Sequence, residues 1–511
     1  MRAIDQLEVI INDSPVKLDD QTLELHVGLK ITLPMPEHDR SLPDTIEAGV
    51  HQAGLFLQRV MFQLLIEKAD QDLVFRRRHG KDGQGIQSRG TRPYPFKTRF
   101  GEVTVQRGRI SHTADGSTEI PSATAWGTPE QMTITQNLRD AVCDLMRDQS
   151  AGDSQVDIGE RAGDPDLLGR STILEILHQE GERLVAAQRA RASAILEEAP
   201  EPEREAVLVP VATDPCDDEL SDVPPDESAE AQAEWEQAQA AWAASGFPGC
   251  EPVGPVAAKA PRQVDEGFVI VQPDEVQTKA QPCTGRKAIC TYTAVVLVAG
   301  WRYSLASATA AGLWLQVAAL LVELGVTCGQ RRLLVLGDGA KWIRDWFEGL
   351  RLDHKVMIAC WYHLKKRCYG QFSLAGGPKD RRRALERAVL EQLWIGEVDA
   401  AIALVRGAME WVRTPQALED LITYLEKRRG TIPNYQQRQR GGLWIASTRV
   451  EKFNDWSVSE RCKGRGMSWT SQGVLSLAAL EAARENGELE SWRQTRELPE
   501  IRLPEPERMV A

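Results

Sequence analysis

The chain has 511 residues, 42% of them hydrophobic and 26% charged, with a formal net charge of −13. This length exceeds what one ordinary hydrophobic core supports, so we expect two or three domains. An acidic total normally argues against a nucleic-acid partner, because phosphates are met by Lys and Arg.

The charge is unevenly distributed along the chain. Fifteen Asp and Glu residues stand against the single Arg204 between Glu197 and Glu236, so the rest of the chain is nearly neutral. Between Arg76 and His112, ten Lys and Arg residues stand against two acids. The distribution of charge decides the partner more than the total does. This segment predicts a phosphate-facing surface, in which we assign DNA contacts to Arg76, Arg77, Arg78, Arg107 and Arg109.

Cysteine content and hydropathy indicate a cytoplasmic protein. The nine cysteines are an odd number without a CxxC pair, which is typical of reduced thiols. No positively charged start leads into an apolar stretch, so we expect no signal peptide. The most apolar window, Ala308 to Leu324, is short for a bilayer span and contains Gln316 and Glu323. It predicts a buried amphipathic helix, and we expect no membrane association.

Residues 1–196 predict an α+β region that binds DNA. Apolar residues recur at helical spacing from Ile46 to Leu64, which indicates one long amphipathic helix. Two basic strands, Tyr94–Arg99 and Glu102–Ile110, are expected to form a hairpin across Gly101. Helical patterns follow over Met132–Met146 and Ser171–Ile195. Residues 152–169 between them predict either the first helix of a helix-turn-helix or a plain helical packing unit.

Residues 197–263 are rich in Glu, Asp, Pro and Ala and poor in large aliphatics. Such a composition buries too little apolar surface to offset chain entropy. We therefore expect a disordered acidic linker.

The second half of the chain predicts an α/β sheet of mixed strand direction. Three strands are expected first, then helix, strand, helix and strand; their ranges are Phe268–Gln272, Ala288–Ala299, Trp301–Ala306, Leu313–Leu324, Leu333–Leu336, Ala340–Leu350 and Val356–Ala359. Residues 363–427 are helical in pattern, and residues 430–442 are basic and loop-like. The last strong helix is expected to begin near Thr448 and to end at Gly464 and Gly466.

Two aspartates follow apolar runs of this predicted sheet. Asp274 comes just after Phe268–Gln272, and Asp338 stands between Gly337 and Gly339 just after Leu333–Leu336. Carboxylates at neighbouring strand ends are suited to binding the two Mg²⁺ ions that phosphodiester chemistry uses. Each has a simpler alternative: Asp338 as a helix N-cap and Asp274 as a turn residue.

A third acid, Glu451, lies in the last helix among basic residues. Glu451 and Asn454 fall on one face at helical spacing. A carboxylate flanked by cations is consistent with an acid that holds a metal against a phosphate. The DNA-contact candidates near it are Arg449, Lys452, Arg461 and Lys463.

The order of these motifs resembles that of DDE transposases of bacterial insertion sequences, close to the ISKra group and related to Mutator-like elements. The resemblance covers roughly residues 265–495. It is carried by the motifs Gly337-Asp338-Gly339-Ala340-x-Trp342-Ile343, Cys360-x-x-His363, Val450-Glu451 and Arg461-x-Lys463-x-x-Gly466-Met467-x-Trp469.

The resemblance implies an RNase H-like catalytic domain, residues 264–362 and 446–495, interrupted by a helical insertion, residues 363–445, and followed by a tail, residues 496–511. It also implies that Asp274, Asp338 and Glu451 are the catalytic acids and bind two Mg²⁺ or Mn²⁺ ions. At the first acid the sequence has Asp274-Glu275 where the family has Asp-Gly, which leaves both acids as candidates for that ligand.

Cys360, His363 and Trp469 have several interpretations. Cys360 and His363 are expected to support the active site, to pack in the core or to bind metal, although one Cys and one His do not complete a four-ligand zinc site. Asn454 is a further support candidate. Trp469 is expected either to stack on a base or to pack in the core.

The predicted function is metal-dependent cleavage of DNA at the ends of an insertion sequence, followed by strand transfer into target DNA. The predicted partners are the double-stranded ends and target, bound by a homo-oligomer in the cytoplasm, at the nucleoid. Two alternatives remain: a decayed or domesticated DNA-binding copy, and an RNase H-like nuclease without strand transfer.

Overall fold

The computed structural model describes residues 6–11, 16–17, 23–24, 27–32, 42–80, 85–129, 131–210, 267–464 and 466–501. The chain divides into two compact units, Met1–Glu180 and Gly181–Ala511. The division falls inside helix α5 (Arg170–Glu198), not at the predicted boundary after residue 196. The second half of α5 belongs to the C-terminal unit because Ala192 and Leu196 are buried in the core of that unit.

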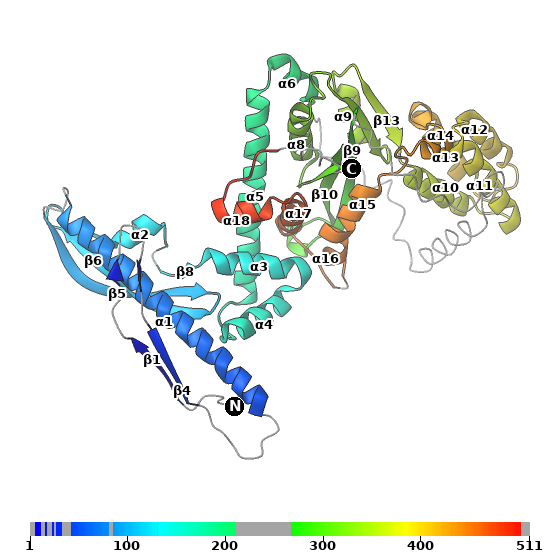
Figure 1. The fold of residues 1–511 in the computed structure, drawn as a ribbon. Helices are drawn as coiled ribbons and strands as arrows, with labels where there is room; N and C mark the ends of the chain where they lie inside the picture. The colour runs from blue at the N-terminus through cyan, green and yellow to red at the C-terminus, as the bar shows by residue number, and fades with distance from the viewer. Residues whose placement is uncertain are drawn as a thin grey trace, which may run out of the picture. The chain divides into compact units, whose positions relative to one another are not determined.

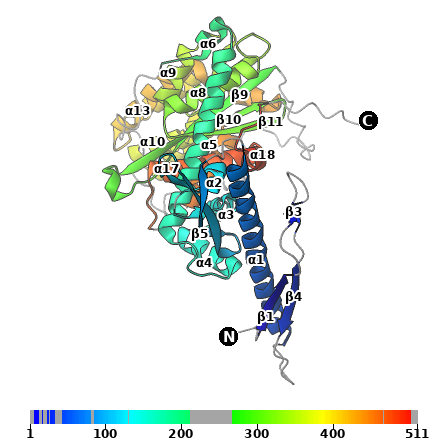
Figure 2. The ribbon, with the colours of Figure 1, turned by 90° about the vertical axis from the view of Figure 1, so that its left-hand side faces the viewer.

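The N-terminal unit is built around a long helix and a basic hairpin. Helix α1 (Leu42–His79) is a single rod (Figure 1, Figure 2) that packs on β5 (Ile86–Thr98) and β6 (Gly101–His112). Phe62 of α1 contacts the rings of Phe96 and Phe100 edge to face. The predicted helix and hairpin are therefore confirmed, and both are longer than expected because the alternation and the helical spacing weaken before the elements end.

The remaining elements of this unit are short strands and three further helices. Strands β7 and β8 extend the hairpin to a sheet of order β7-β6-β5-β8. The bounds are β1 (Gln6–Ile11), β2 (Val16–Lys17), β3 (Leu23–Glu24), β4 (Val27–Thr32), β7 (Thr118–Glu119), α2 (Pro121–Trp126), β8 (Thr133–Ile134), α3 (Gln136–Asp148) and α4 (Ala151–Ala162). Helix α4 fills the segment for which the sequence left open a helix-turn-helix or a packing unit.

Part of the predicted acidic linker is helical. Residues 201–207 form α6 (Glu201–Val207), which packs on α8 (Ala310–Glu323) and buries Ala206 and Val207. Glu201 and Glu203 lie in its first turn, where negative charge favours a helix. The predicted start of the linker at residue 197 is therefore wrong, and residues 211–263 of that prediction lie outside the described residues.

The C-terminal unit contains a five-stranded sheet of order β11-β10-β9-β12-β13. Strand β10 is antiparallel to β9 and β11, whereas β12 is parallel to β9 and β13. The strands are β9 (Phe268–Lys279), β10 (Ala288–Val298), β11 (Trp301–Ser307), β12 (Arg332–Gly337) and β13 (Lys355–Ala359). The predicted α/β class with mixed strand direction is confirmed.

Helices cover both faces of this sheet (Figure 1). Alternate residues point to opposite faces, so Val269 and Val271 pack toward α8 (Ala310–Glu323) and α9 (Lys341–Gly349), while Ile270 packs toward the later helices. The later elements are α10 (Trp361–Ala375), α11 (Lys379–Trp394), α12 (Val398–Gly407), α13 (Pro415–Arg428), α14 (Tyr435–Arg440), α15 (Thr448–Asn454), a π-helical turn (Asp455–Ser459), α16 (Glu460–Cys462), α17 (Ser471–Glu485) and α18 (Leu489–Thr495).

Several predictions for this unit are confirmed and two are corrected. The apolar window around α8 is a buried helix, with Leu313, Val317 and Leu321 at its core. The segment between β13 and α15 is helical, as its pattern predicted, and residues 435–440 are helical too and not a loop. Strand β9 continues to Lys279, so Asp274 lies inside the strand and not beyond its end.

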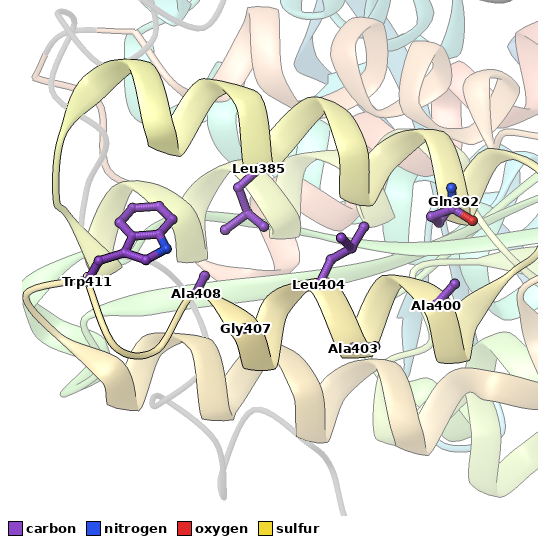
Figure 3. Close-up of a pocket in the computed structure, with 8 residues that line it drawn as sticks. All are labelled: Leu385, Gln392, Ala400, Ala403, Leu404, Gly407, Ala408 and Trp411. Carbon is purple, nitrogen blue, oxygen red and sulfur yellow. The ribbon is translucent and has the colours of Figure 1, made fainter.

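Helices α11 and α12 of the insertion lie side by side and leave an open apolar groove of about 690 Å³ (Figure 3). Leu385, Leu404 and Trp411 line it together with small residues of α12. None of the three candidate acids borders this groove, so it lies outside the predicted site.

None of the described helices combines the length and apolar character needed to cross a membrane. Among the described cysteines, six carry free thiols, namely Cys143, Cys283, Cys328, Cys360, Cys368 and Cys462.

One predicted DNA contact, Arg107, is a buried structural residue. It points inward on β6, where its Nε donates to Ser122 Oγ at 2.8 Å and its guanidinium lies 4.5 Å from the ring centre of Tyr94. Ser122 in turn donates to Asp70 of α1, which also accepts the Gly108 amide at 2.6 Å. The run of basic residues predicted that Arg107 would lie on the surface. Composition alone does not show which residues of a strand face inward.

We predict that Arg107→Gln lowers the free energy of unfolding by about 3 kcal/mol, since removing one partner of a buried charge network leaves the others unpaired. Arg92→Gln is the control, because Arg92 is the exposed cross-strand neighbour of Arg107. Thermal and denaturant unfolding followed by circular dichroism measures the difference. Equal stability of the two variants would contradict the structural role.

Candidate active site

The first two candidate acids lie at the same level on neighbouring parallel strands. Val335 of β12 is paired with Val271 of β9, and Asp338 and Asp274 each follow three residues later. Neighbouring strands lie about 4.8 Å apart. In β9 and β12, Asp274 and Asp338 share the parity of Ile270 and Leu334, which pack toward the later helices. Both carboxylates therefore emerge on that face of the sheet.

The backbone around Asp338 forms a tight turn into α9. The Asp338 carboxylate accepts the amide of Ala340 at 2.8 Å, and Ala340 occupies the cap position of α9. Gly339 has a φ of +77°, a conformation that a side chain would strain. The predicted N-cap alternative is thus replaced by a turn that holds Asp338 two residues before the cap.

The third acid, Glu451, is placed by two attachments of α15 to β9. The buried side chain of Gln272 accepts the amides of Arg449 and Val450 at 3.1 and 3.4 Å, so it caps the start of α15. At the other end, Asn454 donates to Asp274 at 2.8 Å.

Asn454 is itself held by the sheet. Its amide oxygen accepts the hydroxyl of Thr293 at 2.7 Å, and Thr293 is the cross-strand partner of Asp274 on β10. Because Asn454 and Glu451 are three residues apart on a helix, they share the face that meets β9. Asp274, Asp338 and Glu451 therefore converge on one side of the sheet.

This geometry distinguishes Asp274 from its neighbour Glu275. Asp274 bonds Asn454, and its pKa responds to the charges of Asp338 and Glu451. Successive strand residues point to opposite faces, so Glu275 is directed away from this cluster. Asp274 is the acid that joins the other two.

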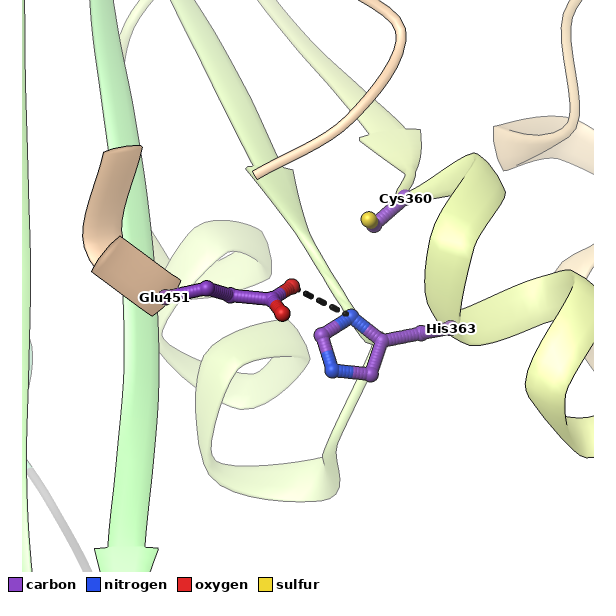
Figure 4. A group of neighbouring side chains, drawn as sticks. All are labelled: Cys360, His363 and Glu451. Carbon is purple, nitrogen blue, oxygen red and sulfur yellow. Dashed lines mark ion pairs between the residues drawn. The ribbon is translucent and has the colours of Figure 1, made fainter. Parts of the chain in front are cut away.

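Glu451 is also in contact with the Cys360-x-x-His363 motif (Figure 4). His363 Nδ1 lies 3.5 Å from Glu451 Oε1, and Ser447 donates its hydroxyl to the same oxygen at 3.1 Å. Cys360 is buried, and its sulfur accepts the amide of Ser447 at 3.3 Å. One ligand atom from each of Cys360, His363 and Glu451 lies within 4.8 Å of the others, which is three ligands of the four that a structural zinc site uses.

The acids are held in an environment that disfavours their charges. Burial, helped by the charges of Asp338 and Glu451 and opposed by His363, raises the pKa of Asp274 to about 7. Burial also raises the pKa of Glu451, opposed by His363 and by the hydrogen bond from Ser447. Burial alone lowers the pKa of His363, but Cys360, Glu451 and Asp274 outweigh it and raise that pKa to about 10. The imidazolium is thus the cation that offsets the acids.

The three carboxylates suit hard divalent cations. Mg²⁺ and Mn²⁺ prefer carboxylate oxygens and water, and several acids in one place stay ionised only when a cation neutralises them. The pKa of Asp274 is raised mainly by burial, and the neighbouring carboxylates of Asp338 and Glu451 add to that effect. The donor set therefore fits Mg²⁺ or Mn²⁺ held by Asp274, Asp338 and Glu451.

The basic residues predicted near Glu451 divide into two groups. Arg449, Lys452 and Lys463 are exposed. Arg461 is buried with its guanidinium 5.1 Å from the ring centre of Trp469, which is also buried. The prediction of Arg461 as a surface contact is wrong, because Arg461 lies on the buried side of α16 against the Trp469 ring.

Trp469 is fixed to the far end of β9. Its amide donates to the Lys279 carbonyl at 3.0 Å, and its carbonyl accepts the Gln281 amide at 2.9 Å. Because Trp469 is buried at this position, it packs in the core and does not offer a surface on which a base could stack.

The basic residues predicted in the N-terminal unit remain largely accessible. Arg76, Arg77 and Arg78 are exposed at the end of α1, with Arg77 paired to Glu119 at 3.1 Å, and Arg109 is half-buried.

Sequence reasoning missed three residues that position the acids: Gln272, Thr293 and Ser447. Gln272 stands two positions before Asp274, and the shared strand parity was a usable signal. Arg428 donates to the carbonyl of Gly339 at 2.8 Å from a helix 89 positions later, and no local pattern indicates this contact.

We predict that Gln272→Leu lowers the free energy of unfolding by about 1–2 kcal/mol, because the amides at the start of α15 lose their acceptor in a buried place. Gln277→Leu on the same strand is the matched control, with an expected change within about 0.5 kcal/mol. Denaturant unfolding measures both. Equal free energies of unfolding for Gln272→Leu and Gln277→Leu would show that α15 does not depend on this cap.

The chain was compared with known proteins. Residues 285–498 match the model of a family described as "Uncharacterised protein family (UPF0236)". The matched range contains Asp338, Cys360, His363 and Glu451 but not Asp274. No curated protein matches the chain significantly.

Proposed function

We propose that this protein is a DDE-type DNA transposase that cuts the ends of an insertion sequence and joins them to target DNA. One observation carries the proposal: Asp274, Asp338 and Glu451 converge from two parallel strands and one docked helix. The acids come from distant parts of the sequence: the strand ends predicted that Asp274 and Asp338 would be neighbours, and the transposase resemblance implied that Glu451 would join them.

The topology of the C-terminal unit supports the finer fold assignment that this proposal includes. In chain order the sheet is 3-2-1-4-5, and its second strand alone runs against the others. An RNase H-like domain is expected to have this order and these directions. The helices between β13 and α15 stand where the resemblance implies an insertion.

The chain's own residues orient the acids for metal binding. Asn454 fixes one oxygen of Asp274, and Ser447 fixes one oxygen of Glu451. Two bound Mg²⁺ or Mn²⁺ ions supply charge neutralisation for the attacking and leaving oxygens of a phosphodiester. Hydrolysis at the element end and attack by the freed 3′-hydroxyl on target DNA are both in-line displacements, so no covalent enzyme intermediate is needed.

Exposed basic residues support a DNA partner in each unit. Arg449, Lys452 and Lys463 lie close in the chain to Glu451, and Arg76, Arg77 and Arg78 end α1. Phosphate contacts of this kind position DNA without reading its sequence. A homo-oligomer that bridges two ends, working in the cytoplasm at the nucleoid, completes the proposal.

The proposal predicts Mg²⁺-dependent cutting and joining of DNA. The full-length protein is incubated with Mg²⁺, a labelled duplex whose sequence borders its gene, and a supercoiled target plasmid. Asp338→Asn is expected to reduce cleavage about a thousandfold, since metal stabilisation of the transition state is worth several kcal/mol. Asp345→Asn is the matched control, because Asp345 is an exposed acid of α9 paired with Lys341 at 2.6 Å.

The products separate the alternatives. Joined plasmid that depends on Asp338 supports the transposase. Cleavage without joining indicates a nuclease that uses the same acids. Binding without cleavage in wild type and variant alike indicates a decayed copy and contradicts the proposal.

A further inference from the structure

Three arginines from three helices gather beside the Asp338 turn. Arg428 ends α13, Arg367 lies on α10 and Arg344 on α9. Burial lowers the pKa of Arg428, and the charges of Arg344 and Arg367 lower it further against Tyr424 and Asp338. The arginine cluster, defined as Arg344, Arg367 and Arg428, therefore carries more positive charge than Asp338 alone offsets.

Arg428 is held rigidly against the backbone next to Asp338. Its guanidinium lies 3.8 Å from the ring centre of Tyr424, and Nη2 donates to the Gly339 carbonyl at 2.8 Å. A Cβ at Gly339 would lie 2.8 Å from Arg428 Nε, so glycine there makes room for this approach. The guanidinium of Arg367 lies over the same Tyr424 ring at 5.6 Å.

The cluster keeps donors that the described residues do not use. Nε of Arg428 and Nε of Arg344 are buried, and neither has a hydrogen-bond partner in the described part of the chain. A buried donor left unpaired is costly, and a guanidinium presents its donors as a fork that matches two oxygens of a phosphate. Two guanidinium groups over one ring, with a third close enough to act on Arg428 and two donors unpaired among the described residues, thus indicate a site for an anion.

We propose that Arg428, with Arg367 and Arg344 beside it, binds a phosphate of the DNA backbone next to the one that is cut. This assignment rests on the proposed function, which makes Asp338 a metal ligand and DNA the substrate. The insertion would then do more than separate two halves of the catalytic unit. Its helix α13 supplies the phosphate contact that positions the DNA strand next to the three acids.

Binding of DNA in the absence of cutting tests this site. The full-length protein is titrated into a fluorescent duplex that borders its gene, in Ca²⁺ in place of Mg²⁺, at several salt concentrations. Arg428→Gln is expected to weaken binding about tenfold to a hundredfold and to lower the slope of log K against log salt by about one. Arg367→Gln, which leaves the Gly339 contact in place, is expected to weaken binding in the same direction.

Arg429→Gln is the matched control, because Arg429 is the next residue, is exposed and pairs with Asp399 at 2.7 Å. It is expected to bind within about twofold of wild type. Unchanged affinity and slope in both Arg428→Gln and Arg367→Gln would overturn the proposal. A different result is also informative: DNA binding that depends on Arg428, in a wild-type protein that does not cut DNA in Mg²⁺. That result would support the phosphate site and contradict the proposed function.

Discussion

The attachment of α15 to strand β9 is the interaction on which the site depends. Gln272 caps the first amides of the helix, and Asp274 accepts the side chain of Asn454 near its last turn. The two contacts fix both the position and the rotation of α15, and Glu451 lies between them. Without them, an acid more than a hundred residues from Asp338 has no reason to meet it.

The cost of this arrangement is the proximity of like charges in a poorly solvated place. Asp274 has a pKa of about 7, so the metal-free site holds a proton or relies on His363 for compensation. The same repulsion is what a divalent cation removes, so the strain and the affinity for metal have one origin. The arginine cluster serves the substrate in a comparable way, because it holds cationic donors ready for an incoming phosphate.

Much of the fold could be predicted from the sequence, because periodicity records local structure well. The hairpin, the helix α8, the order of strands and helices and the helical character of residues 363–427 all follow from apolar spacing. Asp338 was recognisable from its glycines, since a strand followed by Gly-Asp-Gly needs both space and unusual backbone angles.

Tertiary environment was harder to predict than local structure. Arg107 and Arg461 belong to basic runs but point inward, a fact that depends on which face of the element is covered. Gln272 and Arg428 act across 177 and 89 residues, so their partners cannot be predicted from the neighbouring sequence, although the strand parity that Gln272 shares with Asp274 was a usable signal. The predicted linker began too early because α6 is anchored by only two buried residues, Ala206 and Val207, which are too few to change the average composition of the segment.

Direct measurement of metal binding tests the central claim, that three acids form a two-metal site. Mn²⁺ is titrated into the full-length protein and followed by electron paramagnetic resonance, which counts bound ions and detects coupling between neighbouring ones. The account predicts two coupled Mn²⁺ ions per chain, with the coupled signal lost in Asp274→Asn, Asp338→Asn and Glu451→Gln and kept in Asp345→Asn. A single isolated Mn²⁺, or a coupled pair that survives all three substitutions, would contradict it.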